Sequence, residues 1–400
     1  MSVIRYYPQL ATGDGFPKPS VPMLPPLSAA HWLGGKSGAS SFLGEATNFT
    51  QGRYALLFAL EALGVDAESA VLMPAYHCRS LVEPADLLGA RVLFVPVNED
   101  LTLRLDLAEG LVASSQFPVK AMVLPHYFGF PQPVVPIERF CQAHSISLIE
   151  DCAHAFFGRA DGRLLGRIGR FSFASPRKFF PIEDGGILLD NAPVVGAAPR
   201  LHRQPLKTEI RALVHGAQSL LRRRPRRRPA NPSSGPIMDG LAWPDHHDLD
   251  ESTDTYDTGL KWLVPHRRRL ASTWISRRIL NGAALELIVV KRRQFYQRWL
   301  TGLSGMSGCR PLFPRLDHET VPYVFPLLIE RNPDAVFRAL KTQGVPLWRW
   351  EDMAVTDCAV SKRYRHGLLQ LPCHQALEDD EIEWLTRAVK ETLNAFQQGA

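Results

Sequence analysis

The segment RFSFASPRKFFPIEDGGILL, residues 170–189, places Lys178 among prolines and phenylalanines between two short apolar runs. A pair of glycines precedes the second run. An amine that is partly withdrawn from water loses its proton more readily, because burial disfavours the charged form. Most single lysines lie at the surface with only their stems covered. This setting therefore makes Lys178 a candidate reactive group whose partners must be found elsewhere in the chain.

The composition is that of an ordinary globular protein, with 45% hydrophobic and 22% charged residues among 400. The six cysteines are scattered without a C-x-x-C pair, which argues against a disulfide framework and against a zinc site. Residues 1–45 are Pro-rich and lack the pattern of a signal peptide, so we expect an extended arm. With no apolar run long enough to span a bilayer, the sequence predicts a cytoplasmic protein.

Short apolar runs alternate with helical patterns from about residue 50 onward. The runs do not alternate internally, which is typical of parallel strands buried on both faces. We therefore predict an α/β fold with a mainly parallel, doubly wound, seven-stranded type of sheet in a large domain, and a smaller α/β domain after it. The runs lie at 70–76, 90–97, 120–129 and 146–151; the predicted domains cover 46–200 and 263–400.

Acidic residues end one of these apolar runs, in SLIEDCAHAFFG, where Asp151 is followed by His154. In open parallel sheets, ligands bind at the carboxyl ends of the strands. Asp151 could simply cap a helix. Together with Lys178, however, it meets the needs of pyridoxal phosphate chemistry: an amine that attacks an aldehyde, and a carboxylate that keeps a pyridine nitrogen protonated. Gly52, in NFTQGRYALL, opens a helix whose free amide groups suit a phosphate.

The order of these motifs resembles the DegT/StrS-type sugar aminotransferases, a branch of the fold-type I pyridoxal-phosphate enzymes. The glycine-initiated helix, PHYFG, IEDCAHAFFG, and FSF with Lys178 and DGG carry the resemblance, which extends over about 45–190. It implies pyridoxal 5'-phosphate as cofactor and a homodimer. It also implies that Lys178 is the Schiff-base lysine, that Asp151 faces the pyridine nitrogen, and that His154 lies near the 3-hydroxyl group.

The phosphate-binding positions depart from the family pattern. Gly52 and Arg53 stand where the family has a Gly-Thr turn. Ser172 matches the family serine, but the lysine follows it by six residues where the family has five, so Ser175 is an alternative. The Gly-Tyr-Asn loop that reaches into the partner's site has no clear counterpart.

The ring-stacking aromatic of the family is also displaced. Its place is occupied by Cys78, so Tyr76 or His77 is expected to stack on the cofactor instead. In PHYFG, His126 and Tyr127 are either buried polar residues at the end of a strand or substrate contacts. Both interpretations stay open at this point.

A basic segment interrupts the α/β pattern. Residues 201–230 hold nine Lys or Arg and one Glu, a local charge of +8, and an acidic stretch follows. We predict an insertion over 201–262 that is partly disordered. Three explanations compete for 206–228: a solvated loop, peripheral contact of an amphipathic helix with the membrane, and, least favoured for want of any nucleic-acid-binding motif, contact with nucleic acid.

The predicted function is amino-group transfer from glutamate or a similar donor to a keto sugar, expected to be nucleotide-linked, for polysaccharide or glycan biosynthesis. Two alternatives remain. A pyridoxal-phosphate-dependent sugar dehydratase would share the fold, although that branch typically lacks the lysine. A non-catalytic relative would act by binding a membrane or a partner protein.

Overall fold

The computed structural model describes residues 3–9, 15–28, 40–44, 46–193, 199–221 and 256–398. The disorder predicted within the 201–262 insertion falls largely on residues 222–255, which lie outside these ranges. Among the described helices, none combines the length and apolar character needed to traverse a bilayer.

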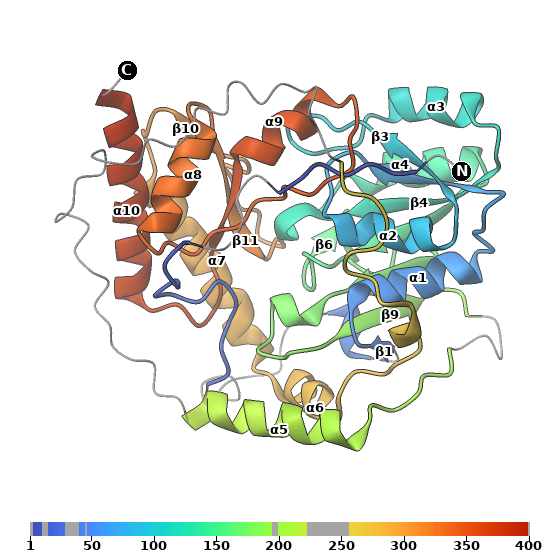
Figure 1. The fold of residues 1–400 in the computed structure, drawn as a ribbon, viewed down its shortest axis with the longest axis horizontal. Helices are drawn as coiled ribbons and strands as arrows, with labels where there is room; N and C mark the ends of the chain where they lie inside the picture. The colour runs from blue at the N-terminus through green and yellow to red at the C-terminus, as the bar shows by residue number, and fades with distance from the viewer. Residues whose placement is uncertain are drawn as a thin grey trace.

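A seven-stranded sheet organises the N-terminal half of the chain, with strand order β1-β9-β8-β5-β4-β2-β3 (Figure 1). The five strands from β3 to β8 run parallel, whereas β9 and β1 are antiparallel to their neighbours. The prediction of a mainly parallel, doubly wound sheet is confirmed. The strands are β1 (Thr47–Phe49), β2 (Ala70–Pro74), β3 (Arg91–Val95), β4 (Val119–Pro125), β5 (Ser147–Asp151), β8 (Phe171–Ala174) and β9 (Gly186–Asp190), with a separate hairpin of β6 (Arg159–Ala160) and β7 (Arg163–Leu164).

Both faces of this sheet are buried, which explains the continuous apolar runs in the sequence. Val71 and Ile149 point to the face covered by α1 (Gly52–Ala62) and α2 (Arg79–Leu87). Their neighbours Leu72 and Leu148 point to the other face, where residues of α3 (Leu105–Ser114) and α4 (Val134–Ala143) belong to the same core cluster. The strands therefore alternate between two apolar layers rather than between core and water.

The C-terminal elements form a smaller antiparallel sheet with helices around it (Figure 1). Its core is continuous with one face of the large sheet, so the two parts share one apolar cluster. The predicted boundaries at 46–200 and 263–400 stay a prediction. The elements are α5 (Leu206–Leu221), α6 (Trp274–Gly282), α7 (Leu285–Gly302), β10 (Cys309–Pro311), β11 (Val324–Ile329), α8 (Pro333–Thr342), α9 (Ala359–Gly367), β12 (Leu368–Pro372) and α10 (Asp379–Gln398).

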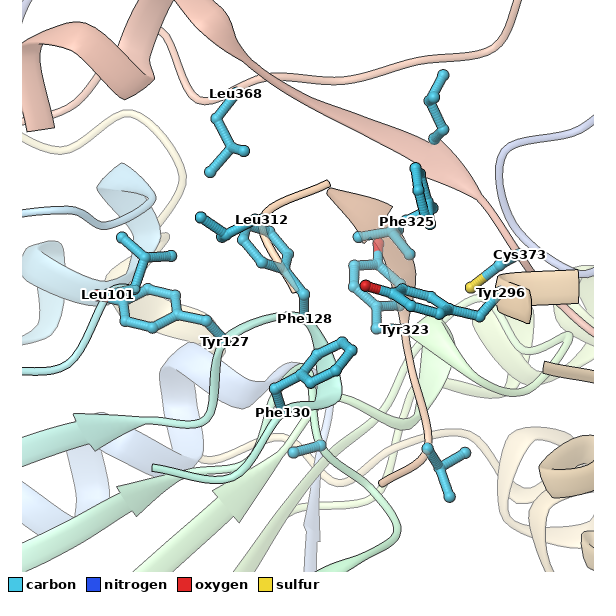
Figure 2. Close-up of a cluster of buried hydrophobic side chains, with 14 of the residues drawn as sticks. Leu101, Tyr127, Phe128, Phe130, Tyr296, Leu312, Tyr323, Phe325, Leu368 and Cys373 are labelled. Carbon is cyan, nitrogen blue, oxygen red and sulfur yellow. The ribbon is translucent and has the colours of Figure 1, made fainter. Parts of the chain in front are cut away.

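The loop after β4 fastens the large sheet to the C-terminal part. The strand predicted over 120–129 ends at Pro125, and Phe128 and Gly129 adopt positive φ angles of 57° and 95°. The amide of Tyr323 donates a 2.8 Å hydrogen bond to the carbonyl of Phe128. Figure 2 shows Tyr127, Phe128 and Phe130 from this loop among side chains of the C-terminal part. Phe130 stacks on Phe313 with ring centroids 4.0 Å apart.

The N-terminal arm is anchored at Tyr6. This side chain is fully buried, and its backbone bridges to Asp257 and Ala354. The Arg79 guanidinium lies 4.1 Å from the centroid of its ring. The part of the arm around Tyr6 is therefore packed against the body of the protein, whereas the predicted extended arm over 1–45 stays a prediction.

Replacement of Gly129 by alanine is expected to destabilise the fold. A Cβ atom there would lie 2.3 Å from the carbonyl oxygen of Val321, and the φ of 95° is unfavourable for other residues. We expect a loss of about 2 kcal/mol or more in the free energy of unfolding, measured by urea denaturation. Gly110→Ala is the control: it lies inside α3 with open space around it, so it should be neutral or stabilising by about 0.5–1 kcal/mol. Equal stability of the two variants would contradict this account of the loop.

Candidate functional site

Lys178 and Asp151 line the same buried cavity. Asp151 ends β5, and Lys178 ends a short 3-10 turn, Pro176–Lys178, that follows the neighbouring parallel strand β8. Because the carboxyl ends of parallel strands meet at one edge of a sheet, two residues 27 positions apart come together. His154 lines the cavity as well. The structure thus brings together the three residues to which the sequence assigns catalysis.

Burial shifts the pKa values of the amine and the carboxyl group toward neutrality. The pKa of Lys178 falls to about 8, chiefly because of desolvation, with the nearby Arg177 and Arg53 adding to the decrease and Asp151 opposing it. The pKa of Asp151 rises to about 6, again chiefly through desolvation, although the amide of Ala153 and the charge of Lys178 oppose the rise. A substantial fraction of the amine is therefore neutral at mildly alkaline pH.

His154 is neutral and has one ring nitrogen available. Burial, assisted by the charge of Lys178, holds its pKa well below the usual value. Its Nδ1 accepts a 3.4 Å hydrogen bond from the amide of Phe128, which assigns the proton to Nε2. The ring packs against Tyr323, with centroids 4.7 Å apart. His154 can consequently donate one hydrogen bond into the cavity from a fixed position.

The start of α1 offers the features of an anion site. The N-cap residue, Gln51, makes no side-chain capping bond, although the amide of Tyr54 donates to the Gln51 carbonyl at 3.1 Å. A Cβ at Gly52 would lie 2.5 Å from Ser175 Oγ, so glycine allows this hydroxyl to approach the helix start. The Thr50 hydroxyl is buried without a hydrogen-bond partner in the described part of the chain. Burial lowers the pKa of Arg53, which an anion nearby would reverse.

Ser172 lies elsewhere, in contrast to the expectation from the family pattern. Its hydroxyl is fully buried and donates to Glu150 Oε2 at 3.0 Å. The strand geometry explains the difference: Phe173 points to the α1 face, so Ser172 points to the opposite face. Of the two serines, Ser175 is the one beside Gly52, and the extra residue before Lys178 places it there.

His126 and Tyr127 are engaged within the protein. His126 Nδ1 accepts from the amide of Gln132 at 3.0 Å, and its Nε2 is 3.2 Å from Glu150 Oε1. The Tyr127 hydroxyl donates to the carbonyl of Tyr76. Both side chains border the cavity, but their polar atoms already have partners. The geometry favours the structural interpretation of these two residues over substrate contact.

Glu150, His126 and Cys152 form a buried polar cluster beneath the cavity. Their potential metal-ligand atoms all lie within 4.8 Å of one another. Each is already used in a hydrogen bond, because Glu150 accepts from His126, from Cys152 and from backbone amides of the 166–169 turn. We interpret the cluster as a structural network that fixes the end of β5.

The C-terminal part contributes an aromatic residue, Trp350, to the lining of the cavity. His77 is not available, because its ring stacks on Phe94 and both its nitrogens contact backbone atoms. Tyr76 packs against Trp350, with centroids 4.8 Å apart, and its buried hydroxyl has no hydrogen-bond partner among the described residues. Trp350 also lies 5.5 Å from His154, centroid to centroid. The sequence gives no sign of this residue, since it is distant from every motif.

The donor groups fit pyridoxal phosphate, whereas the space fits it only after a rearrangement. The amine, the carboxyl group, the imidazole and the uncapped helix start are the groups that this cofactor requires. The cavity between them has a volume of about 30 Å³, which is close to the share of one water molecule in the liquid. Trp350 is one of the residues that line it. A pyridine ring needs more room than this, so its entry requires lining side chains, Trp350 among them, to move.

Arg292 of α7 holds the backbone at Lys178. The guanidinium is fully buried and donates to the carbonyl groups of Lys178, at 3.0 Å, and Tyr323, at 2.8 Å. The Gln375 side chain accepts from Arg292 Nε and donates to the carbonyl of Phe179. Burial among these neutral partners lowers the pKa of Arg292 to about 10. Arg292 and Gln375 thus fix the turn that carries Lys178, a role invisible in the sequence.

Glu150→Gln is expected to destabilise the protein by about 2–3 kcal/mol, because the new amide would face donors and leave buried groups unpaired. Burial alone would raise the pKa of Glu150, but His126 and the turn amides hold it below its usual value. A lowered pKa in the folded state contributes stability above the unfolded pKa of about 4.3, and this contribution is lost as the pH falls through the folded value.

Urea denaturation from pH 3 to pH 7 measures this effect. The difference in the free energy of unfolding between the wild type and Glu150→Gln should have its largest value above about pH 5 and should decrease below about pH 4. Glu138→Gln is the control, because its exposed ion pair with Arg163 should contribute less than about 1 kcal/mol. A difference that is small or independent of pH would refute the role given to Glu150.

The sequence is similar to nucleotide-sugar aminotransferases. It is 32% identical over 144 residues to a dTDP-3-amino-3,4,6-trideoxy-alpha-D-glucose transaminase from Micromonospora megalomicea subsp. nigra, covering 35% of this chain and 38% of the relative. It is 30% identical over 172 residues to a UDP-N-acetyl-3-dehydro-alpha-D-glucosamine 3-aminotransferase from Acidithiobacillus ferrooxidans, covering 43% and 44%. In both cases the match spans less than half of the relative.

Solved structures extend the likeness of the fold to most of the chain. A putative sugar aminotransferase from Streptococcus pneumoniae, in a PLP form, superimposes with a TM-score of 0.64 at 14% identity, over 94% of this chain and 99% of that one. The aminotransferase TlmJ from Streptoalloteichus hindustanus gives a TM-score of 0.62 at 22% identity, over 88% and 87%. The fold is therefore that of these enzymes beyond the N-terminal motifs.

The family expected from the order of the motifs is confirmed by a family model that matches residues 40–209 and includes the start of α1, Asp151, His154 and Lys178. These residues, which make up less than half of the chain, match the model of the DegT/DnrJ/EryC1/StrS aminotransferase family.

Proposed function

We propose that the protein is a pyridoxal-phosphate-dependent aminotransferase that transfers an amino group from glutamate or a similar donor to a keto sugar linked to a nucleotide. The observation that carries the proposal is the convergence of Lys178, with its pKa near 8, and Asp151 on one buried cavity. The similarity to curated nucleotide-sugar aminotransferases supports the substrate class. A homodimer and a cytoplasmic location are part of the same proposal.

The groups that we propose to bind the cofactor have separate tasks. Lys178 would hold the cofactor through its Nζ, and Asp151 would face the pyridine nitrogen. The amide groups at the start of α1, with Gly52, Arg53 and Ser175, would hold the phosphate. When bound, pyridoxal phosphate supplies the electron sink for the carbon that loses its proton.

Proton transfer is the proposed task of Lys178 once its amine is free. A general base works best when its pKa lies near the working pH. Desolvation brings the pKa of Lys178 to about 8, so its Nζ can take a proton from a carbon and return it to another atom nearby. His154 would donate its Nε2 proton to the 3-hydroxyl oxygen of the cofactor, because its Nδ1 already accepts a hydrogen bond from the Phe128 amide.

The decisive test is capture of the cofactor followed by transfer of nitrogen. Purified protein is mixed with pyridoxal phosphate, reduced with borohydride and digested, and the peptide that carries the pyridoxyl group is located by mass spectrometry. We expect the label on Lys178, no capture in Lys178→Ala, and normal capture in Lys120→Ala, a partly exposed lysine remote from the cavity. Capture should rise with pH with a midpoint near 8, because only the neutral amine reacts.

Loaded protein is then tested with glutamate and with a panel of keto-sugar nucleotides. Glutamate should bleach the colour of the bound cofactor, and the right acceptor should restore it with formation of an amino sugar. Removal of a hydroxyl from the sugar without incorporation of nitrogen would identify a dehydratase. Absence of capture at any pH would disprove an enzyme of this type.

A second function is favoured by one observation, the closed cavity of about 30 Å³. A non-catalytic relative would keep the fold, leave Trp350 in place and act through binding of a partner. The two candidates differ in whether Trp350 moves: it would stay in place in the non-catalytic relative and move on cofactor binding in the enzyme.

Trp350→Ala should take up pyridoxal phosphate at least about fivefold faster than the wild type, because it removes one of the side chains that line the cavity. Trp350→Phe should keep the wild-type uptake but lose part of the fluorescence quenching that accompanies it. Trp348→Ala serves as the control, since Trp348 is partly exposed two residues away and does not line the cavity. Equal uptake by all variants would show that Trp350 does not close the site.

A further inference from the structure

Helix α5 packs against the body of the protein at Ala212 and exposes four large apolar residues. Ala212 is buried, with 6% of its surface exposed, whereas Leu206, Ile210, Leu213 and Val214 are 74%, 51%, 43% and 50% exposed. A surface helix normally buries such residues and turns its polar side to water. The spacing i, i+4, i+7 and i+8 gathers the four side chains in one stripe, which we call the α5 stripe.

The α5 stripe faces away from the rest of the chain. Figure 1 shows α5 along the lower edge of the molecule, with α6 between it and the main body. The carboxylate of Glu209 accepts hydrogen bonds from the backbone amide of Trp274, the first residue of α6. This contact and the burial of Ala212 fix the rotation of α5, so the outward orientation of the stripe is set by the fold.

Cations accompany the stripe on α5, and a tryptophan is exposed on the adjoining helix. Lys207 and Arg211 are exposed on α5 itself, and the indole of Trp274 is 54% exposed on the adjoining helix. The sequence after α5 continues with six arginines between 222 and 228, outside the described residues. Apolar side chains flanked by Lys or Arg, with a nearby tryptophan, are the composition of helices that lie in the surface of anionic membranes.

We propose that α5 docks flat on an anionic lipid surface through the α5 stripe, with Lys207, Arg211 and Trp274 at its margin. The helix has 16 residues, which is short for a membrane span of about 20, so it lies along the surface. A second copy of the chain is a poorer occupant. A two-fold symmetric contact over α5 would bring the exposed Lys207 and Arg211 of both copies together, and like charges repel.

The test is flotation of the full-length protein with vesicles of phosphatidylglycerol and phosphatidylcholine, compared with vesicles of phosphatidylcholine alone. The wild type should float with the anionic vesicles, and high salt should weaken the binding. Ile210→Asp combined with Val214→Asp should reduce binding at least about tenfold. Lys207→Glu combined with Arg211→Glu should reduce it by about tenfold or more. Val290→Asp is the control, because Val290 is similarly exposed (55%) on α7.

Thermal denaturation verifies that the variants fold, which is expected because the substituted side chains are exposed. Failure of the wild type to float, or equal flotation of the wild type and both double variants, would overturn the proposal. The proposal would also be overturned if the wild type bound no vesicles and Ile210→Asp/Val214→Asp lost the dimer. That result would assign the stripe to contact with a second copy. The assay needs neither cofactor nor substrate, so its outcome is independent of the proposed reaction.

Discussion

A buried amine opposite a buried carboxyl group is the constraint on which the rest of the site depends. Two ionisable groups withdrawn from water shift toward their neutral forms unless other charges intervene. Lys178 and Asp151 both follow this rule, with pKa values of about 8 and 6. This arrangement is costly for folding, since an apolar pair would avoid the loss of hydration. A cofactor with a phosphate and a ring nitrogen turns the same groups into binding partners.

The surrounding structure holds this pair in place from both parts of the chain. Glu150 fixes the end of β5 through bonds to His126 and to the turn before β8. Arg292 and Gln375, from the C-terminal part, hold the carbonyl groups of Lys178 and Phe179. The hydrogen bonds of the buried Arg292 and Glu150 therefore maintain the geometry of the site as well as the stability of the fold.

The parallel sheet and the central residues of the site were predictable from local signals. Apolar runs without alternation predicted strands buried on both faces, and the position of Asp151 at the end of one of them predicted its place at the sheet edge. The predicted strand over 120–129 was too long, because Phe128 and Gly129 adopt positive φ to meet the C-terminal part. Contacts of this kind are set by tertiary packing and leave no periodic pattern.

Other features of the site depend on residues that are distant in sequence. Trp350 lines the cavity and Arg292 binds the backbone carbonyl of Lys178, and both residues lie more than a hundred positions after Lys178 in the chain. The choice between Ser172 and Ser175 required knowledge of which face of β8 each side chain occupies. The outward orientation of the α5 stripe also required the structure, because the amphipathic pattern alone does not tell which side faces the protein.

The most direct test of the account is a crystal structure of the protein grown with pyridoxamine phosphate. We predict the ring in the cavity, its nitrogen within about 3 Å of the Asp151 carboxyl group, the phosphate at the start of α1, and the Trp350 indole displaced. A structure in which Trp350 keeps its place and the cavity beside Lys178, Asp151 and His154 holds no ligand would contradict the central claim.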